Sequence, residues 1–432
     1  MAIIKVKDNN PAAAIRELLR TMLEKQLVSA ILVPQEIPSK KTVVQTLVSD
    51  PDKLDAVNPL APIFSINSAR IVVKMCIDQM TGPVSGQAVS EQPAEEKEAE
   101  PPEAEDSASE QKQEQAPEQE QGKSGEQAPA EAQSAAEDEP AAAEGQSAPA
   151  PIAVVLRPCE IRALIELVKL QQASLDPFLV IGVDCWGTYS VQDYAAMVTQ
   201  GPQDSSVTAD FLKQVTAGNF PEELRGACRA CQYPVPTYAD LAIQLIGDDI
   251  SQQIRIEAQS EKGKEIFNAL GFEVTAESKE RKSAVEKLKE AKKQLAEQDK
   301  ADFLEMISSL CINCHNCRAV CPICYCKQCV FDGKVFEYPL EKYLNWSGKK
   351  GVLPVPPDKL LFHLTRMSHV ATSCVACGQC EAACPSGIPL GRIFQRISTA
   401  AQEALGYEAG RSLDDDLPLT TFRENELSAV ED

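Results

Sequence analysis

The sequence is 432 residues long, enough for two or three domains, and its formal net charge of −22 argues against a nucleic-acid-binding protein. Most of this charge is local, because residues 91–144 hold eighteen Asp or Glu and three Lys. Sixteen cysteines in so long a chain do not resemble the disulfide framework of a small secreted domain, no stretch is apolar enough for a direct membrane span, and residues 1–8 do not resemble a secretory signal. We therefore expect a cytoplasmic protein whose thiolates bind metal.

The chain opens with a predicted helix and a predicted strand. Residues 11–25 place their large apolar side chains on one helical face, start with proline and follow Asn10, a possible cap. Residues 27–34 are an apolar run of strand length. This order is typical of an α/β layer, and we assign residues 1–83 to its first part.

Residues 84–150 are a tract of Glu, Gln, Ala, Pro and Ser without an aromatic side chain. Such a composition buries too little apolar surface to offset the entropy that is lost on ordering. The sequence predicts a disordered acidic insertion here, with a docking tail as the alternative.

Strands and helices alternate after this tract. Residues 152–156 and 178–183 are predicted buried strands, residues 159–170 a helix, and residues 240–247 a further strand. The alternation predicts a parallel sheet, so the expected fold class is α/β, with residues 151–255 as the second part of that domain.

The next segment, residues 256–310, has a mostly helical pattern that Gly271 interrupts. Its charge predicts an exposed arm. At the end of the chain, residues 407–432 are predicted to form an acidic tail, mobile from residue 413 onward.

Two runs of the form C-x2-C-x2-C-x3-C-P begin at Cys311 and Cys374. This spacing binds 4Fe-4S clusters in two-cluster ferredoxins, where the fourth cysteine of each run ligates the other cluster. We assign Cys311, Cys314, Cys317 and Cys384 to cluster 1, and Cys374, Cys377, Cys380 and Cys321 to cluster 2. A pair of structural zinc knuckles is the alternative.

The spacer between the runs, residues 323–373, is longer than a compact ferredoxin repeat usually allows. Residues 390–405, after the second run, have a helical pattern. We therefore expect residues 311–406 to form a second, mainly helical two-cluster ferredoxin-like domain rather than the small β/α ferredoxin.

Four further cysteines lie in the α/β part. Cys159 and Cys185 each follow a predicted strand, and Cys228 and Cys231 form a C-x2-C pair. The carboxyl ends of parallel strands share one edge of a sheet, where α/β folds place ligands. Four thiolates suit a third iron–sulfur cluster or zinc. Free core cysteines, or Cys159 as an activated thiolate at a helix N-terminus, are the remaining interpretations.

Three thiols exceed what two clusters need: Cys324, Cys326 and Cys329. They could bind zinc, replace Cys321, or help to hold a further cluster with a partner, and they stay unassigned. Cys76 follows an apolar run and is expected in the core. The chain has three histidines: His315, His363 and His369. We expect them to pack in the protein or face solvent rather than bind metal.

The segments LRPCEIRAL at 156–164, VDC at 183–185 and CRAC at 228–231 resemble, in this order, the β-subunit family of deazaflavin (coenzyme F-420) hydrogenases and formate dehydrogenases. The resemblance covers about residues 1–80 and 152–310. It implies an iron–sulfur flavoprotein with a cluster on the four cysteines and an FAD that exchanges hydride with the deazaflavin or passes electrons onward in a complex. PSGIP at 385–389, after the second run, is similar to the iron–sulfur subunits of heterodisulfide reductase.

One departure concerns the flavin. The family usually has a Ser-Gly-Gly turn before its first helix, where backbone amides approach the flavin phosphates. Residues 8–12 read DNNPA here, with no glycine and with a proline that lacks an amide donor. This departure argues against a flavin pocket and favours a domain that holds one cluster.

The expected function is an iron–sulfur electron-transfer subunit of a cytoplasmic anaerobic oxidoreductase complex, such as a hydrogenase, a formate dehydrogenase or a heterodisulfide-reductase-like assembly. It would relay electrons between a partner or flavin and its 4Fe-4S clusters. The expected partners are the other subunits, with ferredoxin as a further candidate. Two alternatives stay open: a flavin-dependent dehydrogenase that oxidises reduced deazaflavin, nicotinamide or ferredoxin, and a non-catalytic assembly scaffold. No residue is assigned a catalytic role.

Overall fold

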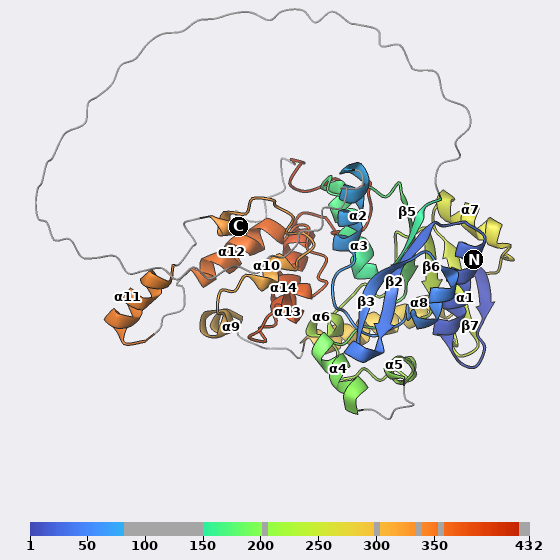
Figure 1. Ribbon diagram of the computed structural model, residues 1–432, viewed down its shortest axis with the longest axis horizontal. Helices are drawn as coiled ribbons and strands as arrows, with labels where there is room; N and C mark the ends of the chain where they lie inside the picture. Colours follow the sequence, from blue (N-terminus) through green and yellow to red (C-terminus); the bar gives the residue numbers. More distant parts are fainter. Residues whose placement is uncertain (82–149, 201–205, 298–302, 334–338, 353–357, 423–432) are drawn as a thin grey trace, which may run out of the picture. The chain divides into compact units, whose positions relative to one another are not determined.

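The computed structural model describes residues 1–81, 150–200, 206–297, 303–333, 339–352 and 358–422, all of which belong to one unit by their contacts (Figure 1). The acidic insertion predicted for residues 84–150 lies outside the described residues except for Ala150. Within the described ranges, no helix is both long and apolar enough to cross a membrane.

Seven strands form one sheet in the order β1-β7-β6-β5-β4-β2-β3 (Figure 1). Four neighbouring strands run parallel: β2 (Ala30–Ile37), β4 (Ile152–Leu156), β5 (Phe178–Val183) and β6 (Leu241–Gln244). Antiparallel strands close the edges: β3 (Thr42–Val48) on β2, β7 (Gln253–Ala258) on β6, and β1 (Ala2–Lys5) on β7. The predicted α/β fold class and its four predicted strands are confirmed, and the antiparallel edges go beyond the prediction.

Alternate residues of the central strands enter two hydrophobic cores. In β4, Ala153 and Val155 belong to one core and Val154 and Leu156 to the other, since the side chains of a strand point alternately to opposite faces. The first core includes residues of α1 (Pro11–Glu24), α5 (Val207–Thr216), α7 (Glu261–Leu270) and α8 (Arg281–Glu297). The second includes α2 (Ala69–Thr81), α3 (Pro158–Lys169) and the C-terminal helices.

The predicted helices at 11–25 and 159–170 are confirmed as α1 and α3. Asn10 caps α1, with its side-chain oxygen accepting from the Ala13 amide at 3.0 Å. Shorter elements connect the layers: η1 (Pro38–Lys40), η2 (Pro51–Ala56), α4 (Val191–Gln200) and α6 (Gly226–Arg229).

The C-terminal region is helical in all its described elements, as predicted. These are α9 (Phe303–Leu310), α10 (Asn316–Ala319), η3 (Val330–Asp332), α11 (Leu340–Lys350), α12 (Lys359–Val370), α13 (Gln379–Ala382) and α14 (Leu390–Ala404) (Figure 1). Two of these helices, α11 and α12, occupy the long spacer between the cysteine runs. The predicted helix at 390–405 is α14, and its inner face is buried.

The structure corrects the arm predicted for residues 256–310. Strand β7 crosses the predicted boundary at residue 256, because its sequence QIRIEA alternates as a half-buried strand does. Helix α8 is not an exposed arm, since Val285, Leu288 and Lys292 are buried along one face.

The structure also corrects the tail up to residue 422. Tyr407, Ala409 and Leu417 are buried against the α/β layer. The buried carboxylate of Glu166 accepts hydrogen bonds from the Tyr407 hydroxyl and, at 2.7 Å, from the Gly410 amide. A carboxylate buried in helix α3 therefore anchors this segment, while residues 423–432 lie outside the described part of the chain.

Candidate metal centres

The four cysteines predicted for cluster 1 line one hollow in the structure. The first three come from the loop before α10 and from α10 itself, and Cys384 comes from the segment after α13. Their grouping follows from packing of the two runs against each other, which is direct between α10 and α13. The structure therefore brings the fourth cysteine of the second run to the first run.

Both cysteine loops turn through the same backbone conformation, a positive φ angle at two matching positions. Asn313 and His315 have φ angles of 57° and 59°, and the corresponding residues of the second run, Ala376 and Gly378, have 56° and 70°. Left-handed backbone at two matching positions is uncommon for side chains other than glycine. It turns each loop so that its thiols face inward, and it identifies the two loops as structural repeats.

The four cysteines predicted for cluster 2 are also neighbours. Burial raises the pKa of the thiols of Cys374, Cys377 and Cys380, that of Cys377 to about 12, and a charge on Cys321 adds to the rise in each. A thiol that feels the charge of another lies close to it. The structure therefore brings Cys321, from the end of the first run, to the second run.

The four cysteines of the α/β part line a second hollow, referred to below as the third site: Cys159, Cys185, Cys228 and Cys231. Cys159 lies in the first turn of α3 and Cys185 two residues after the end of β5. The residue before it, Asp184, accepts 2.6 and 2.9 Å hydrogen bonds from Arg281 and is almost fully buried, which fixes the end of the strand. The remaining two cysteines come from α6 and its C-terminal end.

Three cationic side chains line the third site: Arg157, Arg225 and Lys292. Its lining residues include no carboxylate. Arg225 donates to the Cys228 sulfur at 3.1 Å, and the Thr188 hydroxyl lies 3.4 Å from the same sulfur. Burial acts to raise the pKa of Cys228, but Arg225 and Thr188 outweigh it and lower the pKa. Burial raises the pKa of Cys185 to about 11 against the opposing charges of Arg157 and Lys292. The hollow is therefore suited to a buried anionic group.

A thiolate-ligated 4Fe-4S cluster is such a group, and all three sets of four cysteines fit it. Among the described residues, no three His, Cys, Asp or Glu side chains converge closely enough to hold a single metal ion. The cysteines of cluster 1 and of the third site instead line hollows. Arg366 adds a second observation: its Nε and Nη1 atoms are buried without a hydrogen-bond partner between the cysteines of clusters 1 and 2. A buried cation in this position calls for negative charge on both sides.

One guanidinium joins the third site to cluster 2. Arg225, which donates to the Cys228 sulfur, also donates to the Cys377 carbonyl oxygen at 3.2 Å. The backbones meet closely here, because a Cβ on Gly378 would lie 2.3 Å from the Ala227 Cβ. Two further bonds hold the loops together, from Arg162 to the Val375 carbonyl at 3.3 Å and from Gln395 to the Ala230 carbonyl at 3.0 Å. The three cysteine sets therefore form a row: third site, cluster 2, cluster 1.

The cysteines outside the three sets differ in their surroundings. The Cys324 thiol donates to Cys321 and lowers its pKa, so Cys324 lies beside cluster 2. Cys329 contacts Arg318, and Cys326 is exposed. Cys76 is buried, as expected.

The three histidines differ as well. His369 is exposed and His315 stacks on Phe362 with ring centroids 4.2 Å apart, in agreement with the sequence analysis. His363 is buried, and its Nε2 lies 3.4 Å from the Cys311 sulfur, so it contacts a predicted cluster ligand.

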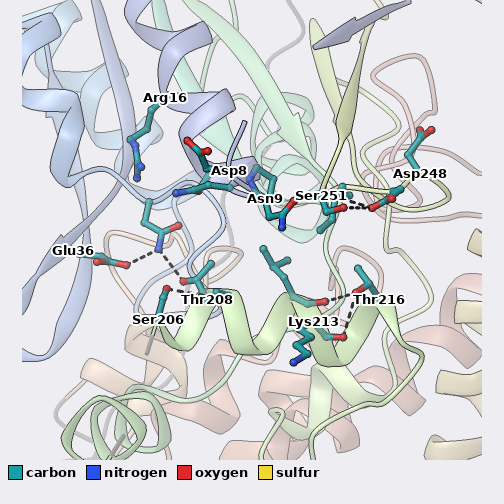
Figure 2. A pocket seen from close by; sticks show the side chains of 18 residues that line it. Asp8, Asn9, Arg16, Glu36, Ser206, Thr208, Lys213, Thr216, Asp248 and Ser251 are labelled. Carbon is teal, nitrogen blue, oxygen red and sulfur yellow. Dashed lines mark hydrogen bonds between the residues drawn. The ribbon is translucent and has the colours of Figure 1, made fainter. Parts of the chain in front are cut away.

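A separate cavity of about 750 Å³ lies where the resemblance would place the flavin phosphates (Figure 2). Asp8, Asn9 and the N-terminus of α1 form one wall, α5 a second, and Asp248 and Ser251 a third. Asp8 and Asn9 both have φ angles of 53°, so the turn keeps a conformation that favours glycine although no glycine is present.

The lining of this cavity does not fit a flavin diphosphate. Pro11 has no amide proton, and the Ala13 amide already donates to Asn10. Carboxylates line the walls instead: Asp8, Glu36, Asp248 and Asp249, against Arg16 and Lys213. Negative charge and occupied amides are the opposite of an anion site at a helix N-terminus.

Sequence reasoning missed the cations at these sites: Arg157, Arg225, Lys292 and Arg366. A signal was present for Lys292, since residues 281, 285, 288 and 292 follow the spacing of one helical face. For Arg225 and Arg366 the sequence carries no such signal, because they belong to the sites through contacts between separate segments.

Comparison with known proteins gives two family matches. The model for the 4Fe-4S dicluster domain matches residues 307–388. The model for the C-terminal part of the beta subunit of coenzyme F420 hydrogenase/dehydrogenase matches residues 150–283. The predicted 4Fe-4S clusters of the C-terminal domain are thus confirmed as a dicluster domain.

Two curated relatives are similar over most of their length. The F420-dependent formate dehydrogenase subunit beta of Methanocaldococcus jannaschii is 31% identical over 303 residues, which are 62% of this chain and 75% of the relative. The F420-dependent formate dehydrogenase 1 subunit beta of Methanococcus maripaludis is 30% identical over 308 residues, with the same coverages. A chain of the F420-reducing NiFe hydrogenase complex from Methanosarcina barkeri aligns with a TM-score of 0.39 and 11% identity, over 71% of this chain and 92% of that chain.

Proposed function

Because the chain belongs to the β-subunit family of F420-dependent formate dehydrogenases and F420 hydrogenases, we propose that it is the iron–sulfur electron relay of an anaerobic oxidoreductase complex. The relay comprises three 4Fe-4S clusters, held by the three cysteine sets described above. Such clusters, when bound, accept and release one electron at a time.

The Arg225 guanidinium is the observation that supports this proposal most directly. It contacts a sulfur of the third site and the backbone of a cluster 2 ligand, at 3.1 and 3.2 Å. Arg366 has the corresponding place between clusters 2 and 1. Both arginines are buried, so they fix the spacing of neighbouring sites and exclude water from the gaps between them.

The two ends of the row differ in exposure. Cys314 of cluster 1 is exposed, whereas the thiols of the third site lie within the α/β domain. A redox partner can therefore approach cluster 1 most closely. The partners we propose are the other subunits of the complex, with ferredoxin as a candidate at cluster 1, and the proposed location is the cytoplasm.

We propose residues 1–83 and 151–297 as the α/β domain, which includes most of the segment first assigned to an arm, and residues 303–422 as the dicluster domain with its anchored tail. The family models at 150–283 and 307–388 support this division. The alternative of a flavin-dependent dehydrogenase is not favoured by the carboxylate-lined cavity. Zinc remains an alternative for the thiols outside the dicluster.

Anaerobic iron analysis combined with a reductive titration tests the proposal. The relay predicts about 12 iron atoms per chain, for three four-iron clusters, and reversible bleaching of the visible absorption of all three. A content near eight iron atoms, or clusters that show no reversible reduction, would contradict the three-cluster relay. Zinc at the third site would appear in the same analysis as one zinc per chain.

A further inference from the structure

Lys292 is the least expected residue of the third site. Helix α8 is rich in lysine, and Lys293, the next residue, is exposed. Lys292 is only 1% exposed and ranks among the largest fully buried side chains of the described residues. An ammonium group buried without compensating negative charge costs several kcal/mol, so its position requires an anionic neighbour.

The neighbours of Lys292 are the cysteine thiols. Lys292 lines the same hollow as the four cysteines of the third site, and its charge acts on both Cys185 and Cys228. The lining contains no carboxylate, and the nearby buried Glu160, whose charge acts on Cys159, lies 3.7 Å from Arg157. The negative charge that offsets Lys292 within the hollow therefore comes from sulfur ligands and from what they bind.

Helix α8 is held firmly on both sides of this lysine. Val285 and Leu288 pack in the core below it. The Lys289 carbonyl accepts from Gln232, which follows the CRAC segment, at 3.3 Å, and the Ala296 carbonyl accepts from Arg392 of α14 at 3.0 Å. The ammonium group is therefore presented to the third site by a helix that contacts both domains.

We propose that Lys292 is a positioning residue that raises the reduction potential of the cluster in the third site. This inference rests on the proposed function, because it requires a cluster there. Reduction adds one electron, and hence one negative charge, to the cluster within the ring of sulfurs. A fixed buried cation stabilises that added charge, and it does so strongly because no bulk water screens it.

The test compares the full-length protein with Lys292→Met, Lys292→Arg and the adjacent exposed control Lys293→Met. Midpoint potentials of the individual clusters are measured by reductive titration with detection by electron paramagnetic resonance. Lys292→Met is expected to make the third cluster at least about tenfold harder to reduce at a fixed potential, which is about 59 mV for a one-electron couple. The potentials of clusters 1 and 2 are expected to change far less.

The two control variants separate charge from shape. Lys292→Arg keeps the charge and is expected to keep the potential, and Lys293→Met is expected to behave as the unaltered protein. Loss of the third cluster in Lys292→Met but not in Lys292→Arg also supports the inference, since it shows that the site needs the charge.

An unchanged reduction potential of the third cluster in Lys292→Met, or equal changes of that potential in Lys292→Met and Lys292→Arg, would overturn the inference that the charge of Lys292 raises it. Failure of the proposed function looks different. If the unaltered protein holds only about eight iron atoms, the third cluster itself is absent and no potential is assigned to it.

Discussion

Two hollows of the α/β domain carry opposite charge. The third site is lined by four thiols and three cations, two of which, Arg225 and Lys292, are buried, and its lining includes no carboxylate. The cavity at the start of α1 is lined by four carboxylates and two cations, and its turn lacks the glycines of the family. A buried group must match the charge of its surroundings, because the protein interior screens charge poorly. The first hollow is therefore suited to an anionic cluster, and the second is unsuited to a diphosphate.

The two hollows also differ in how they lie relative to the dicluster domain. The cysteines of the third site, and the cations around them, lie close to the dicluster domain and contact it through Arg225. The lining residues of the carboxylate-lined cavity include neither a cysteine nor a residue of the dicluster domain. A chain that only relays electrons needs the third site and can lose a flavin site at the carboxylate-lined cavity.

The largest expected effect is on the iron content of the third site. Cys228→Ser removes a thiolate that lies 3.1 Å from Arg225, so the buried cations lose part of their counter-charge. We expect loss of about four iron atoms per chain and lower thermal stability. Cys76→Ser is the matched control, because Cys76 is buried but lines neither cysteine-lined hollow. Equal iron content in both variants would show that the third site holds no cluster.

A smaller effect, on melting temperature and electron transfer, is expected from a substitution where the two domains meet. Gly378→Ala places a Cβ 2.3 Å from the Ala227 Cβ and forces alanine into a left-handed φ of 70°. The backbone cost alone is about 1–2 kcal/mol, and the overlap must also push the third site away from cluster 2. We expect a lower melting temperature and slower electron transfer between these two clusters.

Gly348→Ala provides the comparison for this variant. No atom of another element lies within 4 Å of the added Cβ in α11, so its melting temperature should not fall. If both variants melt alike, the close approach at Gly378 is not important for the contact between domains.

The smallest expected effect is a gain in flavin affinity at the carboxylate-lined cavity. The triple variant Asp8→Ser, Asn9→Gly and Asn10→Gly removes one negative charge and restores a glycine turn. Flavin should then bind about tenfold more tightly, since about 1.4 kcal/mol corresponds to a factor of ten and each new amide contact contributes a similar amount. Fluorescence titration with FAD measures this, with the exposed Asp52→Ser as control. Tight binding of FAD by the unaltered chain would contradict our interpretation of the cavity.

Local patterns were enough to predict much of the fold. The strands at 152–156 and 178–183 are continuous apolar runs, and α1 and α3 have strong helical periodicity. Cysteine spacing was enough to group the thiols of the two runs, because ligands on short loops are constrained by the loop itself. The set in the α/β part was grouped from the ends of two predicted strands and one C-x2-C pair. The anchoring of the tail was not predictable, since it depends on Glu166, a carboxylate that local sequence would place at the surface.

The cations at the sites were missed for the same reason. A lysine in a lysine-rich helix appears solvent-exposed until the packing of α8 shows that residue 292 lies inside. Arg225 acquires its role only when it meets Cys377, 152 residues further along the chain. Arg366 acquires its role only when the two cysteine runs pack on either side of it. The contacts of these two arginines leave no trace in a single sequence, whereas the position of Lys292 on the buried face of α8 follows helical spacing.

The most direct test of the relay is the magnetic interaction between the third cluster and cluster 2. Cys384→Ser removes a predicted ligand of cluster 1, which leaves the two clusters that Arg225 joins. In the fully reduced variant, we predict an electron paramagnetic resonance spectrum that is broadened and split by spin coupling, and that becomes simple when Cys228→Ser is added. A simple, uncoupled spectrum of two reduced clusters in Cys384→Ser would contradict the proposed row.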